Sequence, residues 1–224
     1  MVEQSPPPPE HIYRWARQAA EALSFAHSCG VLHADIHCSN FLLDSNLDLK
    51  VADFAGASID GSRSWSCYRY SHRLFEPGDD DCNKGKGMKI TVQSEIFALG
   101  SAMYAMIQGH DPFVELEHAN DWAEVRRRIQ KREMPDTSCL PILAEVIRKC
   151  WNLEYATMRE VLDAIEADRK EQIGRRIEDV LEAIESHRTP TQYGYRYQRK
   201  CGTTPSSCSS ETLSSGSSVE RFHL

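Results

Sequence analysis

The sequence predicts a mainly helical protein with small β-hairpins, and three stretches carry this prediction. In the first stretch apolar residues recur at helical spacing, in the second two short apolar runs flank a turn, and the third is apolar on every side. At 224 residues, 41% of them hydrophobic and 26% charged, the chain can bury one full core or two small ones.

The first stretch follows a proline-rich leader over residues 1–9, whose four consecutive prolines are incompatible with a helix interior. A helix is expected from Glu10, with Gly30 as its C-terminal stop. One apolar stripe runs along this helix: Ile12, Ala16, Ala19, Leu23 and Ala26. The stripe indicates that one face of the helix packs against the core.

The second stretch predicts a β-hairpin. Residues 41–43 and 49–51 are apolar runs, and turn-forming residues 44–46 lie between them. A hairpin returns the chain to its starting point, so whatever follows residue 51 should lie beside whatever precedes residue 41.

Three polar side chains are therefore expected to meet at the open end of the hairpin. Asp35 and Asn40 lie on the loop before it, and Asp53 follows its second strand. Two carboxylates and a carboxamide form an all-oxygen site of the kind that binds Mg²⁺, and one carboxylate remains to orient or deprotonate a nucleophile. The structural alternative is that these residues only form turns.

Four helices are expected in the rest of the domain: residues 94–109, 119–132, 140–151 and 157–187. The first should be buried on all sides, with Ser94 as its N-cap and Gly109 as its stop. The second should point Trp122, Val125 and Ile129 inward and expose a solvated basic face.

The last of these helices is expected to bend near Gly174. The sequence of residues 160–166 is echoed at 179–185, which leaves a small duplication or a coiled-coil seam open. Beyond residue 187 the chain loses its periodicity and becomes rich in serine, so residues 188–224 are predicted to be a disordered tail.

Composition excludes several classes of function. The net charge of −7 argues against a nucleic-acid partner, and no apolar run is long enough to cross a membrane. The eight cysteines are scattered without a C-x-x-C pair, which indicates reduced thiols in a cytoplasmic or nuclear protein.

The polar stretch is similar to the catalytic loop of eukaryotic protein kinases. Residues 33–40 follow the pattern H-x-D-x-x-x-x-N, and residues 53–54 read D-F as in the metal-binding D-F-G segment. The buried stretch 94–100, S-E-I-F-A-L-G, and the later G-x-x-P-F at 109–113 match the central helix of the same family. The resemblance covers roughly residues 10–166, and the pattern of substitutions is similar to a tyrosine-kinase-like or fungal branch.

The resemblance implies a role for each site residue. Asp35 would be the proton acceptor, and Asn40 and Asp53 would bind Mg²⁺ and, through it, ATP. His37 stands where many kinases carry a lysine that contacts the transferred phosphoryl group. The fold implied for residues 10–187 is a kinase C-lobe with extended C-terminal helices.

The sequence also departs from the family pattern. Ala34 replaces the arginine of H-R-D, Ala55 replaces the glycine of D-F-G, and Glu95 replaces the aspartate that bonds the catalytic-loop backbone. Residues 75–77 are only a scrambled form of A-P-E. No G-x-G-x-x-G and no V-A-I-K strand lysine precede the catalytic loop, so the ATP-covering N-lobe is expected to be absent from this chain.

Three functions follow from the resemblance. The first is phosphoryl transfer from ATP to Ser, Thr or Tyr hydroxyls of a protein substrate, with the N-lobe supplied by a partner. The second is an inactive, pseudokinase-like module that binds a protein partner. The third is a small-molecule phosphotransferase of the aminoglycoside or choline kinase kind. An uncovered C-lobe would also expose apolar surface, which predicts poor solubility or partner binding.

Overall fold

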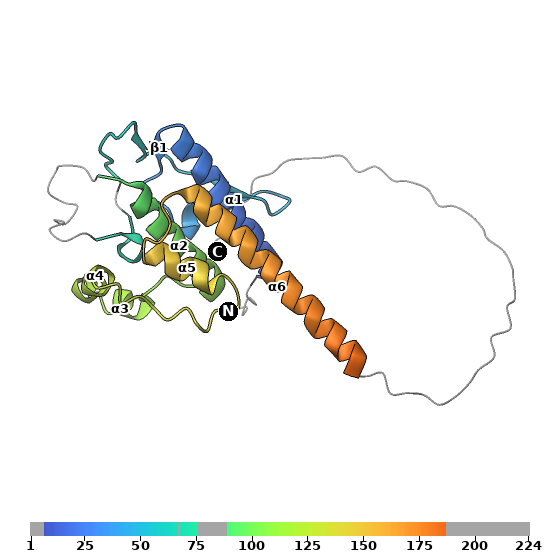
Figure 1. The fold of residues 1–224 in the computed structure, drawn as a ribbon. Coiled ribbons are helices and arrows are strands. Elements are labelled where there is room, and N and C mark those ends of the chain that lie inside the picture. The colour runs from blue at the N-terminus through green and yellow to red at the C-terminus, as the bar shows by residue number, and fades with distance from the viewer. Residues whose placement is uncertain (1–6, 67, 76–88, 187–224) are drawn as a thin grey trace, which may run out of the picture.

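The computed structural model describes residues 7–66, 68–75 and 89–186, and these are mostly helical (Figure 1). Short strands and two 3₁₀ turns (Cys38–Asn40 and Tyr70–His72) connect the helices. The elements in chain order are α1 (Pro9–Ser28), β1 (Val31–Leu32), β2 (Phe41–Leu43), β3 (Leu49–Val51), β4 (Ser58–Ile59), α2 (Val92–Gln108), α3 (Val114–His118), α4 (Trp122–Gln130), α5 (Ala144–Trp151) and α6 (Met158–Ser186). The predicted fold class, mainly α with small β-hairpins, is confirmed.

Helix α2 forms the centre of the core. Its residues from Ser94 to Ile107 are all buried, as expected for a helix that lacks a polar face. The predicted N-cap was wrong, because the helix begins two residues earlier and Thr91 caps it. Ser94 is instead the N3 residue of a capping box, in which each side chain bonds the backbone of the other residue. Gly109 ends the helix at φ 76°, as predicted.

The first and last helices pack side by side along one side of this core (Figure 1). Tyr13 of α1 donates a hydrogen bond to Asp168 of α6, and Arg176 of α6 is 2.6 Å from Glu10. The bend predicted near Gly174 was wrong, because α6 is one continuous helix of 29 residues. Nothing lies within 4 Å of a Cβ built on Gly174, so no neighbouring atom forces the helix to bend there.

Two antiparallel strand pairs shape the chain between α1 and α2. Strands β2 and β3 form the predicted hairpin, with Phe41 opposite Val51 and Leu43 opposite Leu49. Strand β1 pairs with β4, which lies further along the chain after residue 53. The loop that carries Asp35 connects the two pairs, because it runs from the end of β1 to the start of β2.

Two of the predicted helices differ from expectation. Helix α4 begins at Trp122 rather than at residue 119, and Trp122 is 37% exposed instead of facing inward with Val125 and Ile129. Its ring lies against Tyr70, 5.1 Å between centroids. Helix α5 begins at Ala144 rather than at residue 140, because Leu143 adopts a left-handed conformation that an α-helix cannot contain.

The other sequence predictions have mixed outcomes. The described cysteines (Cys29, Cys38, Cys139 and Cys150) are free thiols, as expected. No helix in the described ranges is long and apolar enough to cross a membrane. Residues 1–6 of the leader, the 188–224 tail and the Glu76–Pro77 part of the scrambled motif lie outside the described residues.

Candidate functional site

Glu95, near the start of α2, binds the backbone of the loop that carries Asp35. This fully buried carboxylate accepts hydrogen bonds from the backbone N–H groups of His33 (2.8 Å) and Ala34 (2.9 Å). It also accepts a hydrogen bond from the hydroxyl of Tyr68 and lies 3.4 Å from Nε2 of His27. Burial works against the charged carboxylate, but these partners outweigh it and hold the pKa of Glu95 below its ordinary value.

Glu95 stands at the position where the related pattern has the shorter aspartate, and both backbone bonds are nonetheless formed. They support a strained residue, because Ala34 has φ 70° and only glycine adopts this region freely. The left-handed turn at Ala34 directs the chain so that Asp35 leaves the core while Ala34 itself is fully buried.

His33 ties the loop to the exit of the hairpin. Its Nδ1 accepts the backbone N–H of Asp35 at 3.2 Å, and its Nε2 lies 2.8 Å from the carbonyl oxygen of Ala52. A ring that accepts at Nδ1 must donate at Nε2, so these two bonds fit the neutral Nε2–H tautomer. The ring also lies 4.5 Å from that of Phe54, which is next to Asp53.

Asp35, His37 and Asn40 form one hydrogen-bonded group. The amide nitrogen of Asn40 donates to the backbone carbonyl of Asp35 (2.8 Å) and lies 3.4 Å from its carboxylate. His37 Nε2 lies 3.4 Å from the other carboxylate oxygen. Partial burial opposes ionisation of Asp35, but the bonds from His37 and Asn40 bring its pKa below the ordinary value. Asp35 is therefore ionised at neutral pH.

The hairpin brings the residue before Asp53 back to Asn40. The backbone N–H of Ala52 donates to the carbonyl of Asn40 at 2.9 Å, which places the next residue at the open end of the hairpin. Asp53 has φ 64° and is exposed, and its carboxylate forms no hydrogen bond or ion pair within the described ranges. This φ lies in the left-handed region, which residues other than glycine rarely adopt.

Sequence reasoning missed three residues beside this loop. Arg69 donates to the hydroxyl of Ser39 at 2.8 Å and to Asp111 at 3.1 Å, and His72 lies 3.9 Å from the same aspartate. Arg69 thus brings a guanidinium to the loop that carries Asp35, in which Ala34 stands at the position of the arginine in H-R-D. No sequence signal identifies these residues, because Arg69 lies in an irregular segment 30 residues from Ser39 and 42 from Asp111.

Two buried histidines meet in the same region. The rings of His37 and His72 are 6.3 Å apart, and His37 Nδ1 and His72 Nε2 are buried without a hydrogen bond in the described part of the chain. Burial lowers the pKa of His72 to about 4, so it is neutral at physiological pH. Among the described residues there is no group of three or more His, Cys, Asp and Glu side chains that could hold a metal.

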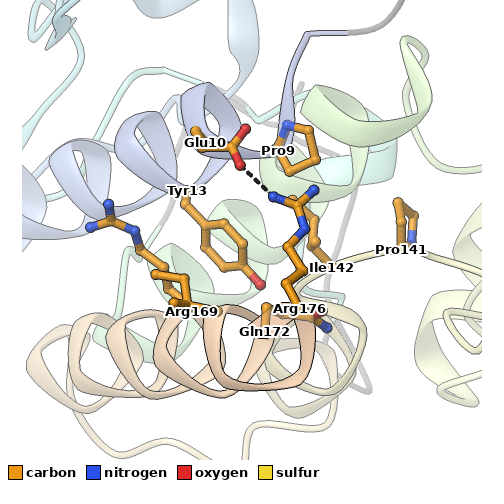
Figure 2. A pocket seen from close by; sticks show the side chains of 9 residues that line it. Pro9, Glu10, Tyr13, Pro141, Ile142, Arg169, Gln172 and Arg176 are labelled. Carbon is orange, nitrogen blue, oxygen red and sulfur yellow. Dashed lines mark hydrogen bonds and ion pairs between the residues drawn. The ribbon is translucent and has the colours of Figure 1, made fainter. Parts of the chain in front are cut away.

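A cavity of about 280 Å³ lies apart from the Asp35 loop, between the start of α1 and the middle of α6 (Figure 2). Its lining residues are Pro9, Glu10, Tyr13, Pro141, Ile142, Arg169, Gln172, Ile173 and Arg176. None of them belongs to the loop, the hairpin or the segment after Asp53. The cavity is therefore separate from the group that Asp35, His37 and Asn40 form.

The Asp35 loop and the residues after the β2–β3 hairpin carry the residue types of the H-x-D-x-x-x-x-N and D-F segments of protein kinases, and the buried helix α2 lies beneath them. The protein kinase domain model matches residues 2–167, about three quarters of the chain. The chain belongs to the protein kinase domain family.

Curated relatives agree with this assignment. The serine/threonine/tyrosine-protein kinase HT1 of Arabidopsis thaliana is 24% identical over 144 residues, 64% of this chain and 35% of the relative. Mitogen-activated protein kinase kinase kinase 9 of the same plant is 28% identical over 155 residues, 68% of this chain and 20% of the relative. The serine/threonine-protein kinase PDK1 of Cryptococcus neoformans is 32% identical over 131 residues, 54% of this chain and 10% of the relative. The chain thus matches about a third or less of the length of each.

Proposed function

We propose that this chain takes part in transfer of the γ-phosphoryl group of ATP to Ser, Thr or Tyr hydroxyls of a protein substrate. The observation that carries the proposal is the hydrogen-bonded group of Asp35 and Asn40, with Asp53 returned to it by the hairpin. The family assignment supports the reaction class, and the roles of the individual residues are part of the proposal.

The side chains fit a magnesium ion. The amide nitrogen of Asn40 is bonded to Asp35, so its carbonyl oxygen is the atom left to accept a cation. The Asp53 carboxylate has no partner within the described ranges and is exposed. Asn40 and Asp53 would hold Mg²⁺ with ATP, and the ion would neutralise phosphate charge. Ligands of this kind are hard oxygen atoms, which Mg²⁺ prefers.

Asp35 is proposed to accept the proton of the substrate hydroxyl. Its lowered pKa keeps it ionised, and its bonds to Asn40 and His37 fix its orientation. His37 is proposed to contact the phosphoryl group, and Arg69 provides a further cation at the edge of the same loop. A weak base of this kind acts through position more than through basicity.

We further propose that residues 10–187 act as the C-lobe of the kinase domain, with the phosphate-covering lobe contributed by another segment or by a partner. A second candidate is a binding module without catalysis. Ala34 and Ala55 favour it, as does the apolar surface after Asp53, where Ile59 is 57% and Trp65 79% exposed. Such exposed apolar side chains are typical of surfaces that contact another protein.

Calorimetric titration of Mg²⁺ and ATP into the purified chain tests the metal site. Asp53→Asn should weaken Mg²⁺-dependent ATP binding at least about tenfold, because it removes a ligand charge. Asp163→Asn, an exposed aspartate on α6, is the matched control and should bind as the wild type does. Absence of Mg²⁺-dependent binding at millimolar ATP would leave the binding-module candidate.

Phosphate transfer to a generic protein substrate then tests catalysis, with an added N-lobe where the chain alone is inactive. Asp35→Asn should lower the rate about 10²- to 10⁴-fold while leaving Mg²⁺-dependent ATP binding intact, because it removes only the proton acceptor. Equal rates for wild type and Asp35→Asn would contradict the proposed role of Asp35.

A further inference from the structure

The second half of α6 extends beyond the rest of the described domain (Figure 1). Its last contact with α1 is the ion pair between Arg176 and Glu10. From there to Ser186 the helix continues for almost three turns. A short helical segment without packing contacts is only marginally stable in water, because most helical stability in proteins comes from packing of an apolar face. The projecting segment of α6 carries such an apolar stripe.

The stripe consists of large apolar side chains that are between 48% and 58% exposed: Ile173, Ile177, Val180, Leu181 and Ile184. Four of them, at 173, 177, 180 and 184, alternate spacings of four and three, as in the a and d positions of a coiled coil. The centre of the stripe is turned about a quarter of a turn away from the α1-facing side at residues 172 and 176. Of the stripe residues, Ile173 also borders the cavity beside α1.

The charged side chains of α6 that flank the stripe and lack a described partner fall into two groups. Arg169 and Lys170 precede the stripe, and neither has a hydrogen bond or ion pair with a described residue. The other group is acidic, and its members too have no such partner in the described part of the chain: Glu178, Asp179, Glu182 and Glu185. The cations without a described partner thus precede the stripe, and these carboxylates without a described partner lie along its second half.

We propose that the second half of α6 pairs in antiparallel orientation with the same segment of a second copy of this chain. In this register Ile173 lies opposite Ile184 of the second copy and Ile177 lies opposite its Val180. Each a position then meets a d position. The stripe is therefore complementary to itself about a two-fold axis, as a symmetric dimer requires.

The charges select the antiparallel orientation. At 100° per residue, Lys170 and Glu185 flank the stripe on the same side, and the antiparallel register places each within about one turn of the other across the dimer. Two intermolecular ion pairs related by symmetry result. A parallel pair in register would instead place Lys170 beside Lys170 and the acidic halves beside each other, which is unfavourable.

The geometry leaves room for both domains. Each domain packs on the first half of its own α6, so the two domains lie at opposite ends of the paired rod. At 1.5 Å per residue, the two Met158 residues would be about 60 Å apart. The packing of α1 on the first half of α6 also anchors the helix, which lowers the ordering cost of pairing its second half.

Analytical ultracentrifugation of the full chain over a wide concentration range tests the proposal. The wild type should show weak, reversible dimerisation, because a seam of two heptads is short. The double variant Ile177→Glu with Val180→Glu places charges in the seam and should weaken association at least about tenfold. Phe25→Glu is the matched control, since Phe25 is 72% exposed on α1, and it should dimerise like the wild type.

Charge reversal tests the orientation. Lys170→Glu alone should weaken the dimer about three- to tenfold through loss of two exposed ion pairs and their replacement by repulsion. Lys170→Glu combined with Glu185→Lys restores the opposite charges and should restore the dimer. In a parallel dimer neither variant would change the affinity. A wild type that is monomeric up to its solubility limit, or a seam variant that dimerises normally, would overturn the proposal.

Discussion

At the scale of single residues, the site depends on the interactions that keep Asp35 ionised beside the buried His37 and His72. His37 lies between Asp35 and Asn40, with its Nε2 within 3.4 Å of the Asp35 carboxylate and 3.2 Å of the Asn40 amide nitrogen. A ring nitrogen either donates or accepts, so the bond to the Asp35 carboxylate requires Nε2 to carry the proton and excludes a hydrogen bond from the Asn40 amide to the same atom. The hydrogen bond from His37 to Asp35 is the strongest of the interactions that lower the carboxyl pKa.

His37→Ala should therefore raise the pKa of Asp35, since burial would remain and the main opposing interaction would be lost. The expected result is protonation of Asp35 at a higher pH than in the wild type. Carbon-13 NMR titration of aspartate carboxyls measures this without requiring activity. His118→Ala, an exposed histidine outside the site, is the control, and an equal Asp35 pKa in both variants would disprove the role assigned to His37.

The lowered pKa of Glu95 leads to a separate prediction about how the stability of the fold depends on pH. Its pKa is lower in the folded than in the unfolded chain, so its contribution is fully present above the unfolded value and is lost as pH falls through the folded value. Glu95→Gln should lose about 1.5–3 kcal/mol at neutral pH, because the backbone N–H groups lose a charged acceptor. Below about pH 4 the difference from the wild type should shrink, as denaturant titrations at several pH values would show. If the difference in unfolding free energy between Glu95→Gln and the wild type did not change with pH, the charge of Glu95 would not contribute to stability.

How much of the site the sequence predicts depends on how local each contact is. Asp35, Asn40 and Asp53 could be brought together from the sequence because one hairpin joins them, and a hairpin is set by its turn residues. Arg69 and Asp111 could not, since they come from an irregular segment and from the loop after α2. Only the packing of that segment on the core places them beside Ser39.

At the scale of elements, the packing of α2 against α5 depends on one residue without a side chain. A Cβ built on Gly100 would lie 2.7 Å from Cβ of Cys150 and 3.3 Å from the ring of Trp151. Both neighbours are fully buried and belong to helix α5, so neither can move without displacing the helix.

Gly100→Ala should destabilise the domain by about 1–3 kcal/mol, since overpacking exceeds the gain in helix propensity. Gly174→Ala is the matched substitution on α6, where nothing lies within 4 Å of the new Cβ. It should stabilise by about 0.5–1 kcal/mol, because alanine loses less backbone entropy than glycine. Urea denaturation compares the two variants, and equal effects would show that the α2–α5 contact is loose.

The same contrast explains which elements the sequence predicts well. Helix α2 and the hairpin are determined by local pattern, and both appear where expected. The orientation of Trp122 and the continuity of α6 are not local properties. Trp122 stacks on Tyr70 at the surface, and Gly174 stays helical because the helix on either side is stable enough to absorb its modest cost.

At the scale of the whole molecule, the first and last helices, α1 and α6, pack against each other and so connect the two ends of the described domain. Asp168 of α6 accepts hydrogen bonds from the hydroxyl of Tyr13 and from the backbone N–H of Leu143, which precedes α5. One carboxylate thus joins α1, α6 and the approach to α5. The loop that carries Asp35 lies between α1 and α2 in the chain, so its position depends on this contact between α1 and α6 as well as on Glu95.

Truncation of α6 tests how far the domain extends. The residues of α6 that enter the core are Met158, Val161, Leu162 and Ile165. Each fully buried side chain contributes about 1.5–3 kcal/mol, so the four together contribute about 6–12 kcal/mol. Net stabilities are about 5–15 kcal/mol, so a chain ending at residue 157 should lose its cooperative thermal transition.

A chain ending at residue 176 is the matched control, because it keeps these four residues, the Tyr13–Asp168 bond and the Arg176–Glu10 pair. It should melt within a few degrees of the full chain when measured at low concentration, since the removed helix is exposed. It should also be monomeric at concentrations where the full chain dimerises, because the paired segment is gone. Persistent dimerisation of this truncated chain would locate the interface elsewhere, and loss of its thermal transition would show that the projecting half of α6 belongs to the folded core.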